Sequence, residues 1–286
     1  MGLPIWTMCP PTYLSTDIAN NIWMKELGKD RVINKDLAMK QWFDLYTILS
    51  QNGLVYLLPP KKGLQDQVYI ANAGAWLPHC KTMIYSNFQA EGRSGEELEL
   101  QNFLDNKLIN NARQNPYKFE GEPECKFIRD NLYCGGYGIR TEKKALDWIE
   151  REFDADIIKL KETNPYLYHL DTSIFPLDED NVLVYTNNFT RSENRELEKN
   201  FNVIPVTEVD AYEGITNSIR AKEMILNASS NIRPETFKKN EHLKEICNKF
   251  GLVPIFINLS EFEKSGALLS CCVLHLNYQR SKLGLG

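Results

Sequence analysis

The chain has little of what marks a protein that binds nucleic acid or membranes. It carries 33 Lys and Arg against 38 Asp and Glu, a formal net charge of −5 over 286 residues. No excess of basic side chains is therefore available for phosphate backbones or anionic lipids. No apolar run reaches the roughly 20 residues that a membrane-spanning helix needs. The expected partner is a small molecule, with neither nucleic acid nor membrane.

The chain also lacks the usual signs of secretion and of a structural metal site. No basic segment followed by a long apolar stretch opens the sequence, so no signal peptide is predicted. Its seven cysteines are odd in number, and no Cys-x-x-Cys pair occurs. The four histidines show no ligand spacing. We therefore expect reduced thiols, a cytoplasmic location and no bound metal.

Apolar periodicity predicts a mixed α/β fold in which a helix is repeatedly followed by a short strand. The helices are expected to begin near positions 36, 96, 143, 191 and 234, so a unit recurs every 43 to 60 residues. By itself this periodicity favours an ordinary open α/β sheet. No low-complexity linker divides the chain, so residues 1–286 are treated as a single domain. Helices are expected at 36–51, 96–110, 142–153, 191–200 and 234–250, and further strands at 68–70, 82–85, 126–128, 131–133, 182–185 and 272–274.

Three distant segments supply a carboxylate, an imidazole and a thiol. They contain Glu120, His169 with Asp171, and Cys271 with Cys272. A thiol nucleophile with a nearby acid/base suits covalent catalysis at a carbon centre. Because the two cysteines are expected to begin a strand, only one of them would face a cleft. Taken alone, the cysteines also fit a buried apolar pair, and His169 also fits a structural histidine.

Other polar residues lie in turns or beside glycines. Asp66 and Asn72 flank an expected strand, and both residue types are common in turns. Arg93 and Arg140 each lie close to glycines, which suits a guanidinium reaching a carboxylate, although either also fits an exposed surface residue. Glu120 precedes Gly121, which permits close backbone approach.

The motifs together are more specific than any one of them. They are Asp66-Gln67-Val68-Tyr69 with Ala71-Asn72-Ala73-Gly74, Asn87-Phe88 with Arg93-Ser94-Gly95-Glu96-Glu97, Phe119-Glu120-Gly121, Gly136-Tyr137-Gly138-Ile139-Arg140-Thr141, Tyr168-His169-Leu170-Asp171-Thr172, and Lys264 through Cys271. In this order the chain resembles the amidinotransferase/deiminase (pentein) superfamily over nearly its whole length. The opening Met8-Cys9-Pro10-Pro11, with Asn21 and Trp23-Met24, is most similar to the arginine dihydrolase branch. The chain departs from the family pattern at Glu122-Pro123-Glu124, at Ile22 and in the single Gly266 before the nucleophile.

The resemblance implies a fold and a set of roles. The fold is a five-bladed α/β propeller, with pseudo-fivefold ββαβ units around a central active site. The implied nucleophile is Cys271, the general acid/base is His169, and the acid holding the guanidinium is Glu120. The other implied substrate ligands are Asp66 and Asp171 for the guanidinium, Arg93 and Arg140 for the substrate carboxylate, Asn72 for a second hydrolysis, and Asn21 in a loop over the site.

The function implied by the resemblance is a cysteine-dependent hydrolase acting on the guanidino group of free arginine, of the dihydrolase or deiminase type, through a covalent thiouronium intermediate. It needs no metal or organic cofactor. Dimethylarginine hydrolysis and amidino transfer are the enzymatic alternatives, and a homo-oligomer is left open. A pentein-fold binding protein lacks the thiol, imidazole and acid present here. A cysteine peptidase gains nothing from so many carboxylates, since a peptide carbonyl is neutral.

Overall fold

Five three-stranded sheets of one design form the sheet structure of residues 3–27, 31–105, 108–230 and 233–278, which the computed structural model describes. In each sheet an antiparallel pair is extended by a third strand that runs parallel to the central one. A parallel neighbour requires a crossover, and a helix supplies it. Four sheets follow in chain order: β3 (Gly74–Leu77), β4 (Thr82–Tyr85) and β5 (Ala112–Gln114); β6 (Cys125–Arg129), β7 (Leu132–Tyr137) and β8 (Asp156–Lys161); β9 (Ile174–Pro176), β10 (Asn181–Val184) and β11 (Asn202–Pro205); β12 (Ser218–Ala221), β13 (Met224–Ala228) and β14 (Val253–Ile257).

The fifth sheet joins the two ends of the chain. β1 (Ile5–Met8) pairs antiparallel with β15 (Leu274–Asn277) and parallel with β2 (Leu54–Leu57). The arrangement of five ββαβ units that the resemblance implies is thus confirmed, and the open sheet favoured by periodicity alone is wrong.

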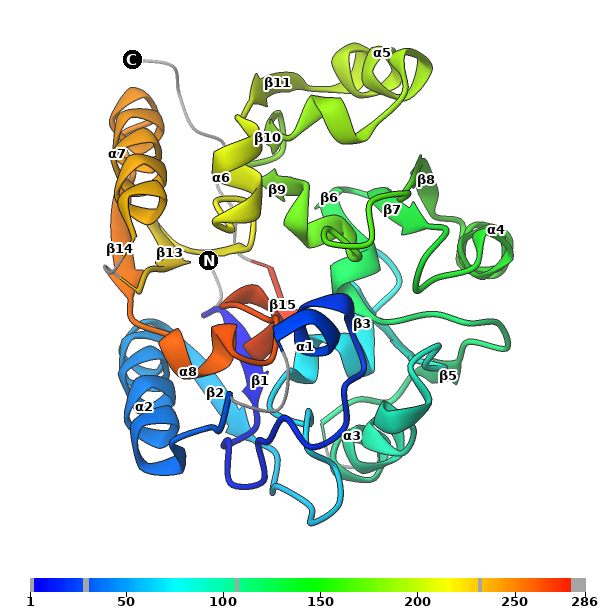
Figure 1. The fold of residues 1–286 in the computed structure, drawn as a ribbon. Helices are drawn as coiled ribbons and strands as arrows, with labels where there is room; N and C mark the ends of the chain where they lie inside the picture. The colour runs from blue at the N-terminus through cyan, green and yellow to red at the C-terminus, as the bar shows by residue number, and fades with distance from the viewer. Residues whose placement is uncertain (1–2, 28–30, 106–107, 231–232, 279–286) are drawn as a thin grey trace.

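The crossover helices lie around the periphery of the molecule (Figure 1). They are α2 (Lys35–Asn52), α3 (Glu96–Leu104), α4 (Lys143–Phe153), α5 (Arg191–Asn200) and α7 (Pro234–Lys249). Each buries at least one leucine completely: Leu45, Leu100, Leu146, Leu197 and Leu243. Burying such a side chain contributes about 1.5–3 kcal/mol. The short helices α1 (Ile22–Leu27), α6 (Glu208–Tyr212) and α8 (Ser260–Glu263) lie outside the repeat.

Local sequence sets the helix ends. Asn34 accepts a hydrogen bond from the backbone N–H of Leu37 and begins α2, and Thr190 forms a capping box with Glu193 at the start of α5. The helix expected at 96–110 is shorter, ending at Leu104, and residues 106–107 lie outside the described residues. Within the described part of the chain, no helix is long and apolar enough to cross a membrane.

A short turn precedes the first strand of each unit, and these turns meet in the middle of the molecule. Four are 3-10 turns, η1 (Ile70–Ala73), η3 (Glu122–Glu124), η4 (Leu170–Thr172) and η6 (Ser270–Cys272). η1 contacts both η3 and η6, and η3 contacts η4. The strand expected at 68–70 is therefore wrong, and the one expected at 272–274 begins only at Leu274, because the chain is still turning before that residue. This geometry brings polar side chains from different units together.

Candidate active site

The turn η6 places Cys271 and Cys272 in different surroundings. Cys271 lines two adjoining cavities, whereas the Sγ atom of Cys272 lies 3.5 Å from the carbonyl oxygen of Leu268. Because both residues lie in a turn, the strand alternation expected for them does not apply, although only one thiol reaches a cavity. Burial raises the pKa of Cys271 to about 12, and the neighbouring Asp171 adds to this shift. The unliganded thiol is therefore protonated at neutral pH.

Asp171 and Asn217 hold the thiol from one side. Asn217 donates from Nδ2 to Asp171 Oδ2 at 3.0 Å, and the same Nδ2 lies 3.7 Å from Cys271 Sγ. Ser270 Oγ donates to Asp171 Oδ2 at 2.5 Å. Asp171 Oδ1 is buried and has no hydrogen-bond partner among the described residues. A cationic ligand next to Cys271 would find this carboxylate oxygen unused.

His169 is held by Glu120. The Nε2 atom of the ring lies 2.8 Å from Glu120 Oε2. Burial lowers the pKa of His169 below its ordinary value, and Glu120 opposes that shift. A neutral ring that carries its proton on Nε2 donates to the carboxylate, which fixes the orientation of the imidazole.

Glu120 is surrounded by donors. Its carboxylate accepts from the backbone N–H groups of Gln89 and Ala90 at 3.1 and 3.0 Å, and from Arg140 Nη1 at 3.0 Å. Burial alone would raise the pKa of Glu120, but Arg140 and His169 outweigh it and lower the pKa to about 2. Glu120 does not line either cavity. Glu120 therefore acts on the site indirectly, because its negative charge holds His169 and Arg140, which line the smaller cavity.

The two arginines predicted to hold a carboxylate both line the smaller cavity and already have partners. Arg93 pairs with Glu96, with Nη2 2.6 Å from Oε2. Arg140 donates from Nη2 to the carbonyl oxygen of Asn20 at 2.8 Å, and its guanidinium carbon lies 4.6 Å from the centroid of the Tyr168 ring. These contacts fix the two cations at the cavity wall.

The segment before α1 lies across the smaller cavity. Asn21 accepts from the backbone N–H of Met24 at 2.9 Å and donates to the carbonyl oxygen of Ser265 at 2.9 Å. It therefore caps α1 and ties that helix to the loop leading to Cys271. Asn20 donates to Asp66, whose carboxyl pKa is raised by burial despite the nearby Arg93.

Asn72 is the contribution of η1 to the site. Its Nδ2 lies 3.5 Å from both ring nitrogens of His169. The side chain is buried and lines the smaller cavity. An amide in contact with the imidazole can hydrogen-bond a ligand and the ring at once.

Two cavities meet at Cys271 and His169. The smaller has a volume of about 20 Å³, and the larger about 250 Å³. Seven of the nine predicted residues line the smaller cavity, while Asp171 lines the larger one and Glu120 lies behind His169. The seven are Asn21, Asp66, Asn72, Arg93, Arg140, His169 and Cys271.

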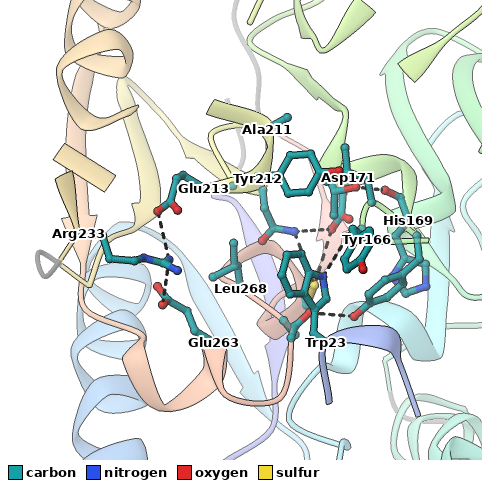
Figure 2. Close-up of a pocket in the computed structure, with 18 of the residues that line it drawn as sticks. Trp23, Tyr166, His169, Asp171, Ala211, Tyr212, Glu213, Arg233, Glu263 and Leu268 are labelled. Carbon is teal, nitrogen blue, oxygen red and sulfur yellow. Dashed lines mark hydrogen bonds and ion pairs between the residues drawn. The ribbon is translucent and has the colours of Figure 1, made fainter. Parts of the chain in front are cut away.

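The larger cavity has an aromatic wall and a charged end. Trp23, Tyr166 and Tyr212 lie on one side, and Arg233 lies between Glu213 and Glu263 at the other (Figure 2). The closest approaches of Arg233 Nη2 to these carboxylates are 3.2 and 3.5 Å. The lining of this cavity includes Asp171 and Cys271 but neither Arg93 nor Arg140.

Sequence reasoning missed three residues of the site: Asn20, Asn217 and Ser270. Asn217 lies in the turn before β12, as Asp171 and Cys271 lie in the turns before β9 and β15. Comparing the turns that precede the first strand of each unit would have pointed to it. No group of three or more His, Cys, Asp or Glu side chains in the described ranges could hold a metal ion.

Comparison with known proteins yields relatives that modify guanidino groups. The model of the family described as N,N dimethylarginine dimethylhydrolase, eukaryotic, matches residues 10–277. The bifunctional arginine dihydrolase/ornithine cyclodeaminase ArgZ of Synechocystis sp. is 30% identical over 274 residues, covering 94% of this chain and 37% of ArgZ. The chain thus spans little more than a third of that relative. The dimethylarginine dimethylaminohydrolase of Mycobacterium tuberculosis is 25% identical over 277 residues, covering 95% of this chain and 85% of the relative.

Solved structures agree with these relatives. The N-terminal domain of ArgZ, an arginine dihydrolase from Cyanobacteria bound to product, superposes with a TM-score of 0.86 at 27% identity, covering 96% of this chain and 97% of that domain. Since the family model spans almost the whole chain, this protein belongs to the N,N-dimethylarginine dimethylhydrolase family.

Proposed function

We propose that this chain is a cysteine-dependent hydrolase acting on the guanidino group of free arginine, as a dihydrolase or deiminase, with residues 1–286 forming one catalytic domain. The observation that carries the proposal is the junction of two cavities at Cys271 and His169, with the carboxylates of Asp66 and Asp171 on either side. A flat cation there can form paired hydrogen bonds with both carboxylates. Its central carbon is then held against sulfur.

The guanidinium is also the activator of the thiol. A pKa of about 12 keeps Cys271 protonated in the empty site. A positive charge within a few ångströms favours the thiolate and lowers this pKa. The nucleophile is thus formed when a cationic substrate is present, which protects the thiol from other reactions.

His169 moves the protons of both half-reactions. It takes up the thiol proton, and the thiolate attacks the guanidino carbon to give a tetrahedral adduct. The imidazolium then donates its proton to the leaving nitrogen, which departs as ammonia and leaves a thiouronium on Cys271. His169 next accepts a proton from water, which attacks the same carbon and releases citrulline and the thiol. Glu120, ionised down to a pH of about 2, stabilises the imidazolium formed in each half.

Glu120 therefore receives a different role from the one that the resemblance implies. Its carboxylate is filled by Arg140, His169 and two backbone N–H groups, and it does not line a cavity. We assign it to orienting His169 rather than to holding the guanidinium, which falls to Asp66 and Asp171.

A second cycle would convert citrulline and water into ornithine, carbon dioxide and ammonia. Asn72 supports this cycle, because its amide reaches the His169 ring from the substrate side. The neutral ureido group lacks the cation that activates Cys271, so an additional hydrogen-bonding group has more to contribute in this step. The relative ArgZ, named an arginine dihydrolase, supports the same assignment.

The larger cavity favours methylated arginine as a second substrate. It begins at Asp171 and Cys271 and has a volume of about 250 Å³, which is ample for methyl groups on a terminal guanidino nitrogen. The family name and the M. tuberculosis relative support this activity. The leaving group would then be methylamine or dimethylamine in place of ammonia.

The test is a product assay on the purified chain. Arginine, monomethylarginine and dimethylarginine are supplied separately, and ornithine, citrulline, ammonia and methylamines are quantified. The proposal predicts ammonia from arginine, with ornithine formed by the dihydrolase and citrulline by the deiminase. Addition of glycine as an acceptor should leave the yield unchanged, since an increase would indicate amidino transfer. No turnover of any of the three substrates would reject the proposal in favour of a binding protein.

A further inference from the structure

Two glutamates outside the proposed mechanism are buried against each other. Glu124 belongs to η3 and Glu162 follows β8, and their exposed fractions are 0% and 2%. The two carboxyl groups adjoin at Gly136. Glu124 Oε1 and both Glu162 carboxyl oxygens have no hydrogen-bond partner among the described residues. Two ionised carboxylates cannot hydrogen-bond each other, whereas one proton shared between them supplies a donor for an oxygen of the other group.

The backbone leaves room for the pair at Gly136 of β7. A Cβ atom at Gly136 would lie 2.4 Å from Glu124 Oε2 and 3.1 Å from Glu162 Cδ. Any larger residue would displace one of the carboxyl groups. Gly136, which belongs to one of the motifs shared with the family, therefore leaves space for the side chains of Glu124 and Glu162.

The surroundings of the pair disfavour its ionisation on balance. Glu120 and Asp171 are acidic groups that disfavour a charge on Glu162, and Arg140 is the basic group that favours one. Burial raises the pKa of Glu162 to about 8, and burial together with Glu162 and Glu120 raises that of Glu124. Two negative charges in one buried pocket would also repel each other, which further disfavours ionisation of both carboxyl groups.

The pair reaches the proposed catalytic segment through one hydrogen bond. Glu124 Oε2 accepts from the backbone N–H of Leu170 at 3.2 Å. Leu170 lies between His169 and Asp171 at the start of η4. The position of Glu124 therefore affects both neighbours at once.

We propose that Glu124 and Glu162 form a proton-sharing carboxyl pair that remains protonated at neutral pH and positions the segment from His169 to Asp171. The protonation does not depend on which reaction the chain catalyses. The positioning role rests on the proposed function. Both glutamates act through other residues, and neither touches a cavity at Cys271.

Infrared spectroscopy tests the protonation directly. The wild-type chain should show the carbonyl stretch of a protonated carboxyl group at neutral pH, declining as the pH is raised through about 8. The Glu124→Gln/Glu162→Gln double variant should lose the part of this band that declines near pH 8, whereas a contribution from Asp66, whose pKa burial also raises, should remain. Glu198→Gln, which removes an exposed carboxylate on α5, should keep the whole band. A wild-type spectrum without the band at neutral pH would overturn the proposal.

Thermal unfolding gives an independent test through proton linkage. A carboxyl whose pKa is raised by folding from 4.5 to about 8 contributes stability that is complete below pH 4.5 and is lost as the pH rises toward 8. The melting temperature of the wild-type chain, relative to that of the double variant, should therefore decrease as the pH rises from 4.5 to about 8. Glu198→Gln should show no such trend relative to the wild type. A difference from the double variant that does not change with pH would contradict a shared proton.

The positioning role is tested by two substitutions of the same residue. Gln at position 124 retains an oxygen for the Leu170 N–H, and Leu does not. We expect Glu124→Leu to lower kcat on arginine by about 10²-fold with little change in KM, as misplacement of catalytic groups does, and Glu124→Gln to retain most of the activity. An equal decrease of kcat in both variants, or a change in KM with kcat unaltered, would refute the positioning role. If Glu124→Leu does not fold, loss of activity in a folded Glu124→Gln refutes it. If the wild type does not turn over arginine, the infrared and unfolding results still decide the protonation.

Discussion

His169 and Glu120 are joined by a 2.8 Å contact between Nε2 and Oε2, although 48 residues lie between them in the sequence. The contact couples the proposed acid/base to a carboxylate that stays ionised down to a pH of about 2. Removal of that charge should therefore lower the pKa of His169 further below its ordinary value.

We expect Glu120→Gln to fold and to lose about 10²–10⁴-fold in kcat on arginine, the range typical of impaired general acid–base catalysis. The amide can still hydrogen-bond His169 but no longer stabilises the imidazolium. The measurement is the pH dependence of kcat, in which the His169 limb should move to lower pH. Full activity with an unchanged profile would show that Glu120 has no such role.

Cys271 and Cys272 give the most direct pair of matched variants. Cys271→Ser should abolish turnover, with a loss of several orders of magnitude as for other nucleophiles. Cys272→Ser should only weaken activity, because that thiol does not line either cavity. Ammonia release and the melting temperature of both variants are the measurements. The reverse order of effects would identify Cys272 as the nucleophile.

A small guanidinium ion should activate Cys271 toward alkylation. In the empty site the pKa of about 12 keeps the thiol protonated, so reaction with iodoacetamide at neutral pH should be slow. A cation between Asp66 and Asp171 favours the thiolate and should accelerate the reaction. The modification of Cys271 is followed by peptide mass spectrometry in guanidinium chloride and in sodium chloride at equal, non-denaturing concentration. A rate that is equal in the two salts contradicts substrate-assisted activation.

Asn72 should influence the second hydrolysis more than the first. Loss of the amide 3.5 Å from the His169 ring removes a hydrogen bond available to the neutral ureido group. We expect Asn72→Ala to release the first ammonia from arginine and to shift the products from ornithine toward citrulline. The product ratio is measured by chromatography. An unchanged ratio, with ornithine still the main product, would remove Asn72 from this step.

Much of the architecture follows from local sequence. The five crossover helices begin at 35, 96, 143, 191 and 234, within one residue of the positions that apolar periodicity indicates. Periodicity detects these helices because each has one buried face. It does not show how the five units close on each other, since the closing contact between β1 and β15 joins opposite ends of the chain.

The centre of the site was less predictable for the same reason. Motifs indicate Cys271, His169 and Asp66, but the apolar residues around Cys271 predict a strand where the structure has a turn. Asn217 and Glu162 lie in no motif. Their importance comes from partners 54 and 38 residues away, Cys271 and Glu124, which only the fold brings together.

The central claim is that the sulfur of Cys271 bonds to the guanidino carbon of a bound substrate. The most direct measurement is mass spectrometry of the chain quenched in acid during turnover of arginine, followed by peptide mapping. The account predicts a thiouronium adduct on the peptide that contains Cys271, in which the amidino carbon and the rest of the arginine remain on the sulfur after ammonia has left. This adduct should be absent in Cys271→Ser and retained in Cys272→Ser. Turnover without any adduct on Cys271, undiminished in Cys271→Ser, would contradict it.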